Sequence, residues 1–435
     1  MGSDIAIRAL TLYAPIAAAV GCWIHRPPTR RALGGVIHAI SWNVALLVPL
    51  QFLAARLGWW SFAVSPGAVV PFPVELVAGW AIAWGALPVL LQPRPRIPVL
   101  LGAAIVLDVA LMPRLTPVLQ LGRWWLVGEG VAIAACLLPG ALLGWWMSDR
   151  RHLGWRAAMQ VLTFAVVAAV LLPATIVALT TDGAGPIATG PSMVLPQLAL
   201  LMAIPGLSAV QEFVERGNGT PIPFDPPERL VTSGVYAYVA NPMQLSMALC
   251  YLPLGAMLHS WWVALAALMS VAYSEGIARW DEDGDLIARA GADWGAYQRA
   301  VRRWRPRWKP FDRSLIGAAP GRLYVDSECP ECTQLGRWFL DRNPVGLSIE
   351  PASSYPGDAL ERITYDPGDG GRHERGVAAV ARALEHLSLG WALVGMLARL
   401  PVLIQALQFL TDASGGEPRV RPAHCSTSTV ATRHA

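Results

Sequence analysis

Residues 156–180 read RAAMQVLTFAVVAAVLLPATIVALT, a run in which Arg156 is the sole charged residue. A helix needs about 20 mostly apolar residues to cross the hydrocarbon core of a bilayer, so this run predicts a membrane span. Runs of the same kind recur along the chain on both sides of it. The further predicted spans are residues 5–24, 33–56, 71–92, 97–118, 124–147, 192–213, 243–258 and 261–278.

The overall composition agrees with a membrane protein. Of the 435 residues, 54% are hydrophobic and 15% are charged, whereas about a quarter of the residues are charged in a soluble domain. The predicted fold class is an all-α polytopic membrane protein of about nine spans, with a small α/β thioredoxin-like domain at the C-terminus. The net charge is +4, and most basic residues lie between apolar runs, which indicates membrane topology rather than nucleic-acid binding.

The basic residues of the loops predict an orientation in the cell membrane. Loops after the first, third, fifth and seventh runs are rich in arginine, whereas the alternate loops carry only Arg56, Arg114 and Arg123. Because cytoplasmic loops are enriched in basic residues, the N-terminus is expected outside and everything after Arg279 in the cytoplasm. The arginines of the first set are Arg26, Arg30, Arg31, Arg94, Arg96, Arg150, Arg151, Arg156, Arg216 and Arg229.

Two cytoplasmic segments are expected to meet at one end of a helical hairpin. The last two apolar runs are separated by His259 and Ser260 alone, which predicts two helices joined by a tight turn. The segment before the hairpin, LVTSGVYAYVANPMQL (230–245), offers aromatic rings, and the segment after it offers the acidic run DED (281–283). Aromatic rings and carboxylates together suit a cation, or a ligand with an adenine face and an amino group.

Residues 217–308 resemble the isoprenylcysteine carboxyl methyltransferase and phospholipid methyltransferase superfamily. The resemblance is carried by GTPIPFDPPERLVTSGVYAYVANPMQL, by the hairpin, and by EDGDL and GADWGAYQRAVRRWRPR after it. It implies an integral-membrane methyltransferase that uses S-adenosyl-L-methionine and acts on a hydrophobic acceptor, either a lipid or an isoprenoid.

The resemblance also implies roles for individual residues. Tyr238 and Asn241 would be catalytic, and a pair of acids would hold the amino end of the cofactor. Ala240 stands where a basic residue is common in the superfamily, Gln244 stands where Tyr is common, and the acid pair is Glu-Asp rather than Glu-Glu. The implied cofactor-binding residues are Gly234, Tyr236, Tyr238, Asn241, Pro242, Met243, Glu282, Asp283 and Tyr297.

Methyl transfer asks little of the side chains. Because the sulfonium of the cofactor is already activated, the protein mainly has to align the acceptor and exclude water, so neither a metal nor a Ser-His-Asp set is required. A second interpretation stays open, in which Tyr236 and Tyr238 are interfacial aromatic residues and the acids begin a solvated helix. The basic segment RRWRPRWKP (302–310) is interpreted as a headgroup anchor.

The composition changes at Gly321, after which a small soluble domain is expected. GRLYVDSECPECTQLGRWFL (321–340) reads as a strand, a turn and a helix, with Cys329 and Cys332 one helical turn apart. The positive end of a helix favours a thiolate. This segment resembles the DCC family of thiol–disulfide oxidoreductases, which implies a redox-active dithiol with Cys329 and Cys332 as catalytic residues and a thiol reductant as partner.

Two alternatives remain for the dithiol, which are a pair of inert thiols and a zinc site completed by His424 and Cys425. The polar tail that carries these last two residues is expected to be disordered. The predicted domains are residues 1–213, an N-terminal transmembrane bundle, residues 214–310, the methyltransferase-like hairpin and cofactor segment, residues 321–412, the DCC or thioredoxin-like domain, and residues 413–435, the tail.

Glu75, Asp108 and Glu129 lie inside three consecutive predicted spans. Intramembrane acids are costly and are functional candidates by default. Their similar predicted depth indicates one shared pocket, with Arg114 as a counter-ion. Residues 58–85 resemble carotenoid-pathway membrane proteins of the lycopene cyclase type, in which acids protonate a polyene. The alternative is a polar cluster that fixes helix packing.

Three functional hypotheses follow from these features. The first is a membrane methyltransferase with an appended redox domain. The second is a membrane-anchored thiol–disulfide oxidoreductase whose methyltransferase-like part is only a scaffold. The third is a carotenoid or prenyl-lipid enzyme that uses the intramembrane acids.

Overall fold

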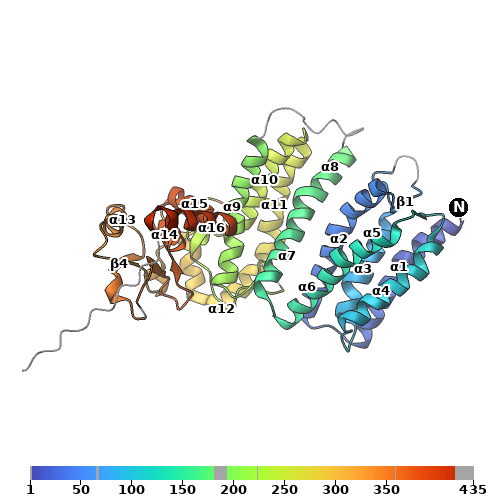
Figure 1. Ribbon diagram of the computed structural model, residues 1–435, viewed down its shortest axis with the longest axis horizontal. Helices are drawn as coiled ribbons and strands as arrows, with labels where there is room; N and C mark the ends of the chain where they lie inside the picture. Colours follow the sequence, from blue (N-terminus) through green and yellow to red (C-terminus); the bar gives the residue numbers. More distant parts are fainter. Residues whose placement is uncertain (1, 65–67, 181–193, 223, 358, 417–435) are drawn as a thin grey trace, which may run out of the picture. The chain divides into compact units, whose positions relative to one another are not determined.

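The computed structural model describes residues 2–64, 68–180, 194–222, 224–357 and 359–416 (Figure 1). The side chains of residues 2, 3, 273 and 277–285 are outside this description. Contacts divide the chain into two units. The first unit comprises Met1–Ser192, Gly219–Pro227 and Leu254–Leu265, and the second comprises Met193–Asn218, Glu228–Pro253 and Ala266–Ala435.

The first unit is a bundle of apolar helices. Figure 1 shows α1 to α6 side by side, and α3 packs against both α1 and α2. Turns of π-helix at Ile133–Leu137 and Val167–Leu171 join α5 to α6 and α7 to α8. The helices are α1 (Gly2–His25), α2 (Arg30–Leu57), α3 (Val74–Leu90), α4 (Ile97–Leu111), α5 (Trp125–Ala132), α6 (Leu138–Asp149), α7 (Leu153–Val166) and α8 (Leu172–Thr180).

Glycines allow the helices of the first unit to approach closely. A Cβ on Gly35 of α2 would lie 2.5 Å from the carbonyl oxygen of Gly144 in α6. A Cβ on Gly85 of α3 would lie 2.5 Å from the backbone nitrogen of Ile40 in α2. Small residues at helix crossings are typical of membrane proteins, where van der Waals packing of the backbones holds helices together.

Two polar features complete the first unit. Strand β1 (Trp60–Phe62) pairs antiparallel with β2 (Leu119–Leu121), and the buried Trp60 ring donates a hydrogen bond of 2.9 Å to Gln51. Arg156 in α7 forms a buried ion pair with Asp225 of the 219–227 segment. Arg156 is therefore paired with a carboxylate in addition to flanking a predicted span.

Among the described residues, six helical stretches are long and apolar enough to cross a membrane, which indicates an integral membrane protein. A seventh is counted if α15 (Leu389–Ala398) and α16 (Pro401–Thr411), which bend by 87° at their junction, are one broken span. The six are Asp4–His25, Arg30–Leu57, Ile97–Leu115, Trp125–Asp149, Leu153–Thr180 and Val194–Glu215.

The other three predicted spans form shorter helices. They are α3, with 17 residues, α10 (Pro242–Met257), with 16, and α11 (Trp261–Tyr273), with 13. A straight crossing needs about 20 residues. A turn of π-helix at Ser274–Ala278 continues α11. That these three helices also cross the membrane, in addition to the six or seven candidate spans, therefore stays a prediction.

The second unit begins with α9 (Val194–Glu215) and contains α12 (Arg279–Ala300), which kinks at Gly291 with φ +44°. A mixed four-stranded sheet follows, in the order β4-β3-β5-β6. Strand β3 (Gly321–Val325) is parallel to β4 (Leu347–Pro351) and antiparallel to β5 (Thr364–Asp366), which pairs with β6 (Glu374–Arg375). Helix α13 (Pro330–Leu340) connects β3 to β4, and α14 (Val377–Leu384) follows β6. A small α/β part at the C-terminus was predicted, and the mixed sheet confirms that much.

A cluster of buried ions ties α14 and α15 to the end of α9. Arg382 and Arg399 are each at least 97% buried and share four carboxylates. Burial opposes charge on Arg382, but the surrounding carboxylates raise its pKa well above the usual value. We call this group the ion cluster; its carboxylates are Glu212, Glu215, Glu374 and Glu385.

Candidate functional site

The segment that carries the aromatic motif is held by backbone hydrogen bonds from the basic segment 302–311. Ala240 and Asn241 donate to the carbonyl oxygens of Arg302 and Arg303, at 3.1 and 3.2 Å. In return Arg307 donates to Tyr238 at 3.0 Å. The basic segment was interpreted as a headgroup anchor, and the structure gives it a second role, because it fixes the backbone that leads into α10.

Asn241 lies at the start of α10 and is 7% exposed. Its side-chain amide donates a hydrogen bond of 3.1 Å to the hydroxyl of Ser274, which is buried at the base of α11. Ser274 opens the π-helical turn Ser274–Ala278, and such turns are frequent at functional sites. The hairpin therefore brings the motif Asn onto the polar end of α11, as the folding-back of two short helices predicts.

A carboxylate that the sequence analysis did not single out lies one residue further along. Glu275 accepts a hydrogen bond of 2.5 Å from the indole nitrogen of Trp304 in the basic segment. We define the hairpin-mouth cluster as Asn241, Ser274, Glu275 and Trp304. The signal that could have identified Glu275 is an acid at the end of an apolar run, seven residues before Glu282, the first acid of the pair that was chosen.

The tyrosines of the motif are packed rather than open. Tyr238 is fully buried, and its hydroxyl donates 2.7 Å to the carbonyl oxygen of Glu385. The hydroxyl of Tyr297 in α12 donates 2.7 Å to the carbonyl oxygen of Tyr236. Burial raises the pKa of both Tyr238 and Tyr297. In this arrangement the two hydroxyls stabilise the motif, and neither is free to contact a ligand.

The backbone conformation at position 234 and the closeness of Glu212 both require glycine there. Its φ is +59°, and a Cβ there would lie 2.7 Å from the carboxyl carbon of Glu212. The preceding Ser233 donates 2.8 Å to the same carboxylate. The glycine of the motif therefore allows the turn η4 (Gly234–Ala237) to pack against the ion cluster.

The remaining predicted cofactor residues divide into two groups. Pro242 begins α10 and is buried, and Met243 packs at the edge of the cluster that contains Tyr236 and Tyr238. Glu282 and Asp283 lie on the backbone of α12, but their side chains are outside the described residues. Their relation to the hairpin-mouth cluster stays a prediction.

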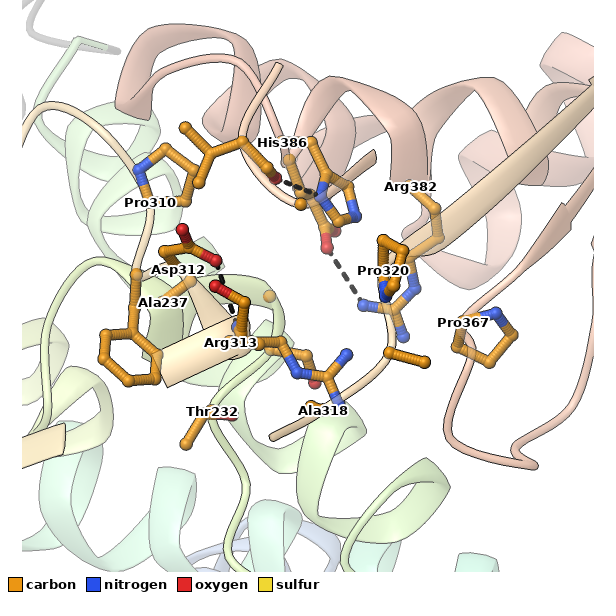
Figure 2. A pocket seen from close by; sticks show the side chains of 18 of the residues that line it. Thr232, Ala237, Pro310, Asp312, Arg313, Ala318, Pro320, Pro367, Arg382 and His386 are labelled. Carbon is orange, nitrogen blue, oxygen red and sulfur yellow. Dashed lines mark hydrogen bonds and ion pairs between the residues drawn. The ribbon is translucent and has the colours of Figure 1, made fainter. Parts of the chain in front are cut away.

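A cavity of about 300 Å³ is lined by Gly234 of the motif together with residues from the C-terminal part of the chain. Figure 2 shows Asp312, Arg313, Arg382 and His386 around it. His386 Nδ1 donates 2.8 Å to the carbonyl oxygen of Val345, so its Nε2 accepts from the hydroxyl of Tyr365 at 2.8 Å. Burial lowers the pKa of His386 to about 4, which keeps the imidazole neutral at physiological pH.

The two thiols of the C-terminal part lie where β3 passes into α13. Cys329 caps the helix, and its sulfur accepts a hydrogen bond of 3.3 Å from the backbone nitrogen of Cys332. Partial burial, together with the neighbouring Cys329, raises the pKa of the Cys332 thiol to about 12. The thiols are therefore unequal, because the pKa of Cys332 is raised and Cys329 occupies the N-cap of α13.

The described residues contain no group of three or more His, Cys, Asp or Glu side chains arranged to hold a metal ion. His424 and Cys425, the further ligands of the zinc alternative, lie outside the described residues, as does most of the tail expected to be disordered.

The structure joins two of the three intramembrane acids. Asp108 in α4 and Glu129 in α5 are 5% and 6% exposed, and their carboxyl groups interact. Within the part of the chain that the structure describes, one carboxylate oxygen of each has no hydrogen-bond partner. Glu75 is half-buried in the first turn of α3, and the described part of the chain records no contact between it and this pair. Arg114, the expected counter-ion, is exposed and donates to the backbone of Ala110.

Comparison with known proteins gives one match. A family model described as phospholipid methyltransferase matches residues 199–283, which include most of α9, the motif and the hairpin. The match ends before Cys329 and Cys332. No curated protein and no solved structure matches the chain.

Proposed function

We propose that the protein is an integral-membrane methyltransferase that uses S-adenosyl-L-methionine and acts on a hydrophobic acceptor, a phospholipid or an isoprenoid. One observation carries the proposal. Within the matched residues 199–283, the motif Asn241 is hydrogen-bonded to Ser274 at the π-turn beside Glu275. A polar cluster at the mouth of an apolar hairpin suits a reaction between a polar cofactor and a membrane-soluble acceptor.

The chemistry of the side chains fits the cofactor. Glu275 supplies a negative charge for a cationic sulfonium or ammonium group. Trp294, which stacks on Tyr297, is 7% exposed, and its buried indole N–H has no hydrogen-bond partner among the described residues. An unpaired buried donor is costly, and a ligand acceptor would satisfy it. Glu282 and Asp283 are the proposed contacts for the amino end of the cofactor.

The cofactor, when bound, supplies an activated methyl group. The protein then has to orient the acceptor and exclude water. Asn241 would orient a polar acceptor group through its amide, and Ser274 fixes the position of that amide. Trp304 and the backbone of the basic segment cover the motif and limit the access of water. Gln244 and Ala240, which depart from the superfamily pattern, are the positions at which acceptor choice would differ.

An acceptor dissolved in the bilayer could reach this site from the side. Leu252 of α10 and Leu268 and Met269 of α11 are 48%, 64% and 72% exposed. These apolar side chains face surroundings that lipid would fill. The proposal requires the hairpin mouth on the cytoplasmic side, so a reporter fused after Trp308 should be cytoplasmic. An extracellular reporter would exclude intracellular S-adenosyl-L-methionine as the cofactor.

A cofactor-binding titration on the purified protein tests the site. Glu282→Gln is expected to weaken binding of S-adenosyl-L-methionine at least about tenfold, because one charge-assisted contact to the amino end is lost. Asp293→Asn is the matched control, since Asp293 is an exposed acid on the same helix. Equal affinities in the wild type and the Glu282 variant would show that the acid pair does not bind the cofactor.

Acceptor identity requires a second experiment. Mass spectrometry of membrane lipids from cells with the wild type, with Asn241→Ala and without the protein should reveal a species heavier by one methylene that only the wild type produces. Asn241→Ala is expected to lower its formation about 100-fold through loss of alignment. Unchanged lipids in all three would contradict the proposed activity even if the cofactor binds.

A second candidate function rests on the unequal thiols. Cys329 would attack a substrate disulfide as the thiolate and form a mixed disulfide, releasing one substrate thiol. Cys332 would then displace the second substrate thiol and close the Cys329–Cys332 disulfide, which a thiol reductant must reduce. Alkylation followed by mass spectrometry should label Cys329 much faster than Cys332 near neutral pH. Equal, slow labelling of both would favour inert thiols.

A further inference from the structure

The outer faces of α15 and α16 are mostly apolar, and Gln405 is an exposed polar residue among them. From Leu389 to Thr411 the single charged residue is Arg399, and it is buried in the ion cluster. Val402, Phe409 and Leu410 are 82%, 72% and 61% exposed. Contiguous exposed apolar surface of this kind marks an interaction site rather than a surface adapted to water.

The helix pair is fixed in its bent form, so it does not cross the bilayer as a straight span. Arg399 lies at the 87° bend, where the ion cluster holds its guanidinium. The far end of α16 is held too, because Arg362 donates to Asp412 at 2.9 Å and Val377 donates to Gln408 at 3.0 Å. Straightening the pair would break these contacts and leave charges unpaired.

The apolar surface is continuous with a helix of the membrane. Helix α15 packs against α9, a candidate span, and Figure 1 shows α15 and α16 beside it. Because Arg399 pairs with Glu212 and Glu215 in the last turn of α9, the bend lies at the level where that span ends. A surface at that level meets the interfacial region of the bilayer.

Basic and aromatic residues border the same surface. Leu389 at the start of α15 donates 2.9 Å to the carbonyl oxygen of Trp308, whose side chain is 67% exposed. The neighbouring Arg302, Arg305 and Lys309 are exposed as well. Tryptophan at the interface and basic residues against anionic headgroups are the usual companions of a helix that lies in the membrane plane.

We propose that α15 and α16 form an in-plane membrane anchor, which holds the C-terminal α/β part against anionic lipid on the side where α9 ends. The occupant of the apolar surface is the bilayer interface. This inference does not depend on methyltransferase activity, since the apolar surface of α15 and α16 lies outside the matched residues 199–283.

Depth-dependent fluorescence quenching tests the anchor in the full-length protein. The six native cysteines are replaced, and a bimane label is attached to Val402→Cys or to Phe409→Cys in vesicles of phosphatidylcholine and phosphatidylglycerol. Leu340→Cys, 53% exposed at the end of α13, is the matched control. Lipids with a nitroxide on the acyl chain should quench the labels at 402 and 409 severalfold more than the control, and aqueous iodide should show the reverse order.

Two outcomes would overturn the proposal. Iodide quenching at 402 and 409 equal to that at 340 would mean that the surface faces water. Protection from both quenchers would mean that protein, such as a second copy of the chain, covers it. A combined Arg302→Gln, Arg305→Gln and Lys309→Gln variant should lose part of the lipid quenching in vesicles with phosphatidylglycerol, and no change would refute the role given to anionic headgroups.

Discussion

In the first unit, α2 crosses α3 and α6 through glycines, whereas in the second unit two buried arginines and four carboxylates tie α9 to α14 and α15. Glycine crossings are nearly insensitive to the exact side chains around them, because the contact is between backbones. A buried ion cluster requires every partner. The geometry around the candidate site in the second unit therefore depends on individual side chains.

The same contrast appears around the motif. Ser233 and Gly234 rest on Glu212, and Tyr238 donates to the backbone of Glu385. Both acids belong to the ion cluster. Glu212 lies within the matched residues 199–283 and Glu385 lies beyond them, so the C-terminal part contributes to the support of the segment that leads into α10.

Removal of one arginine of the ion cluster is expected to have the largest effect. Arg382→Met leaves four carboxylates with Arg399 as their one remaining arginine in the ion cluster, so the second unit should lose about 3–5 kcal/mol of stability. Hydrogen exchange of the α14 and α15 amides measures this locally. Arg375→Met, a change at an exposed arginine on β6, is the control. Similar exchange in the two variants would mean that the cluster does not hold the unit together.

A pair of glycine substitutions separates backbone strain from contact. Gly58 at the end of α2 has φ +66° with open space around its Cβ position, and Gly234 has φ +59° with Glu212 at 2.7 Å. Gly58→Ala should cost about 1 kcal/mol for the left-handed backbone alone. Gly234→Ala should cost about 1–3 kcal/mol more, because the carboxylate has to move. Thermal unfolding of both variants measures the difference in stability between them. Equal decreases in melting temperature would mean that the contact with Glu212 does not contribute to the cost.

His386 predicts a pH dependence confined to the second unit. Its pKa is about 4 in the folded chain and about 6.5 unfolded. Above pH 6.5 the imidazole of His386 is neutral in both the folded and the unfolded state, and no stability is lost. As the pH falls toward 4, the imidazole gains a proton in the unfolded state only, which favours unfolding. Stability should fall across that window by at most about 3 kcal/mol, because the side chain keeps some exposure.

The control for this titration keeps the hydrogen bonds and removes the charge change. His386→Gln can still donate to Val345 and accept from Tyr365, so the slope between pH 6.5 and 4 should flatten. His25→Gln changes an exposed histidine of the first unit and should leave the slope intact. A slope that persists in His386→Gln would assign the acid sensitivity to other groups.

The features that the sequence predicted are local in character. Apolar runs predicted the helices, including the two joined at His259 and Ser260, since hydrophobicity over about 20 residues is visible without knowledge of partners. The strand, turn and helix expected around Cys329 follow from neighbouring residues in the same way.

The features that the sequence did not predict depend on distant partners. Tyr238 meets the carbonyl of Glu385 across 147 residues, and Arg156 meets Asp225 across 69. The hydrophobic periodicity of the sequence does not predict such a contact, because each of the two residues taken alone could equally lie at an exposed position. Arg399 shows the same limit, because its place among four carboxylates depends on the fold.

The smallest expected effect comes from a comparison inside the first unit. Arg94 pairs with Asp149 at 2.5 Å with side chains 32% and 39% exposed, whereas Arg156 and Asp225 are 2% and 4% exposed. Arg94→Gln should cost less than about 1 kcal/mol, and salt should reduce the cost further, because water already solvates both charges. Arg156→Gln, which leaves Asp225 buried, should cost about 3–5 kcal/mol with little salt dependence. If the two variants unfold at the same temperature, burial is not what separates the strong ion pairs of this protein from the weak ones, and the contrast between its two units would have to rest on helix packing alone.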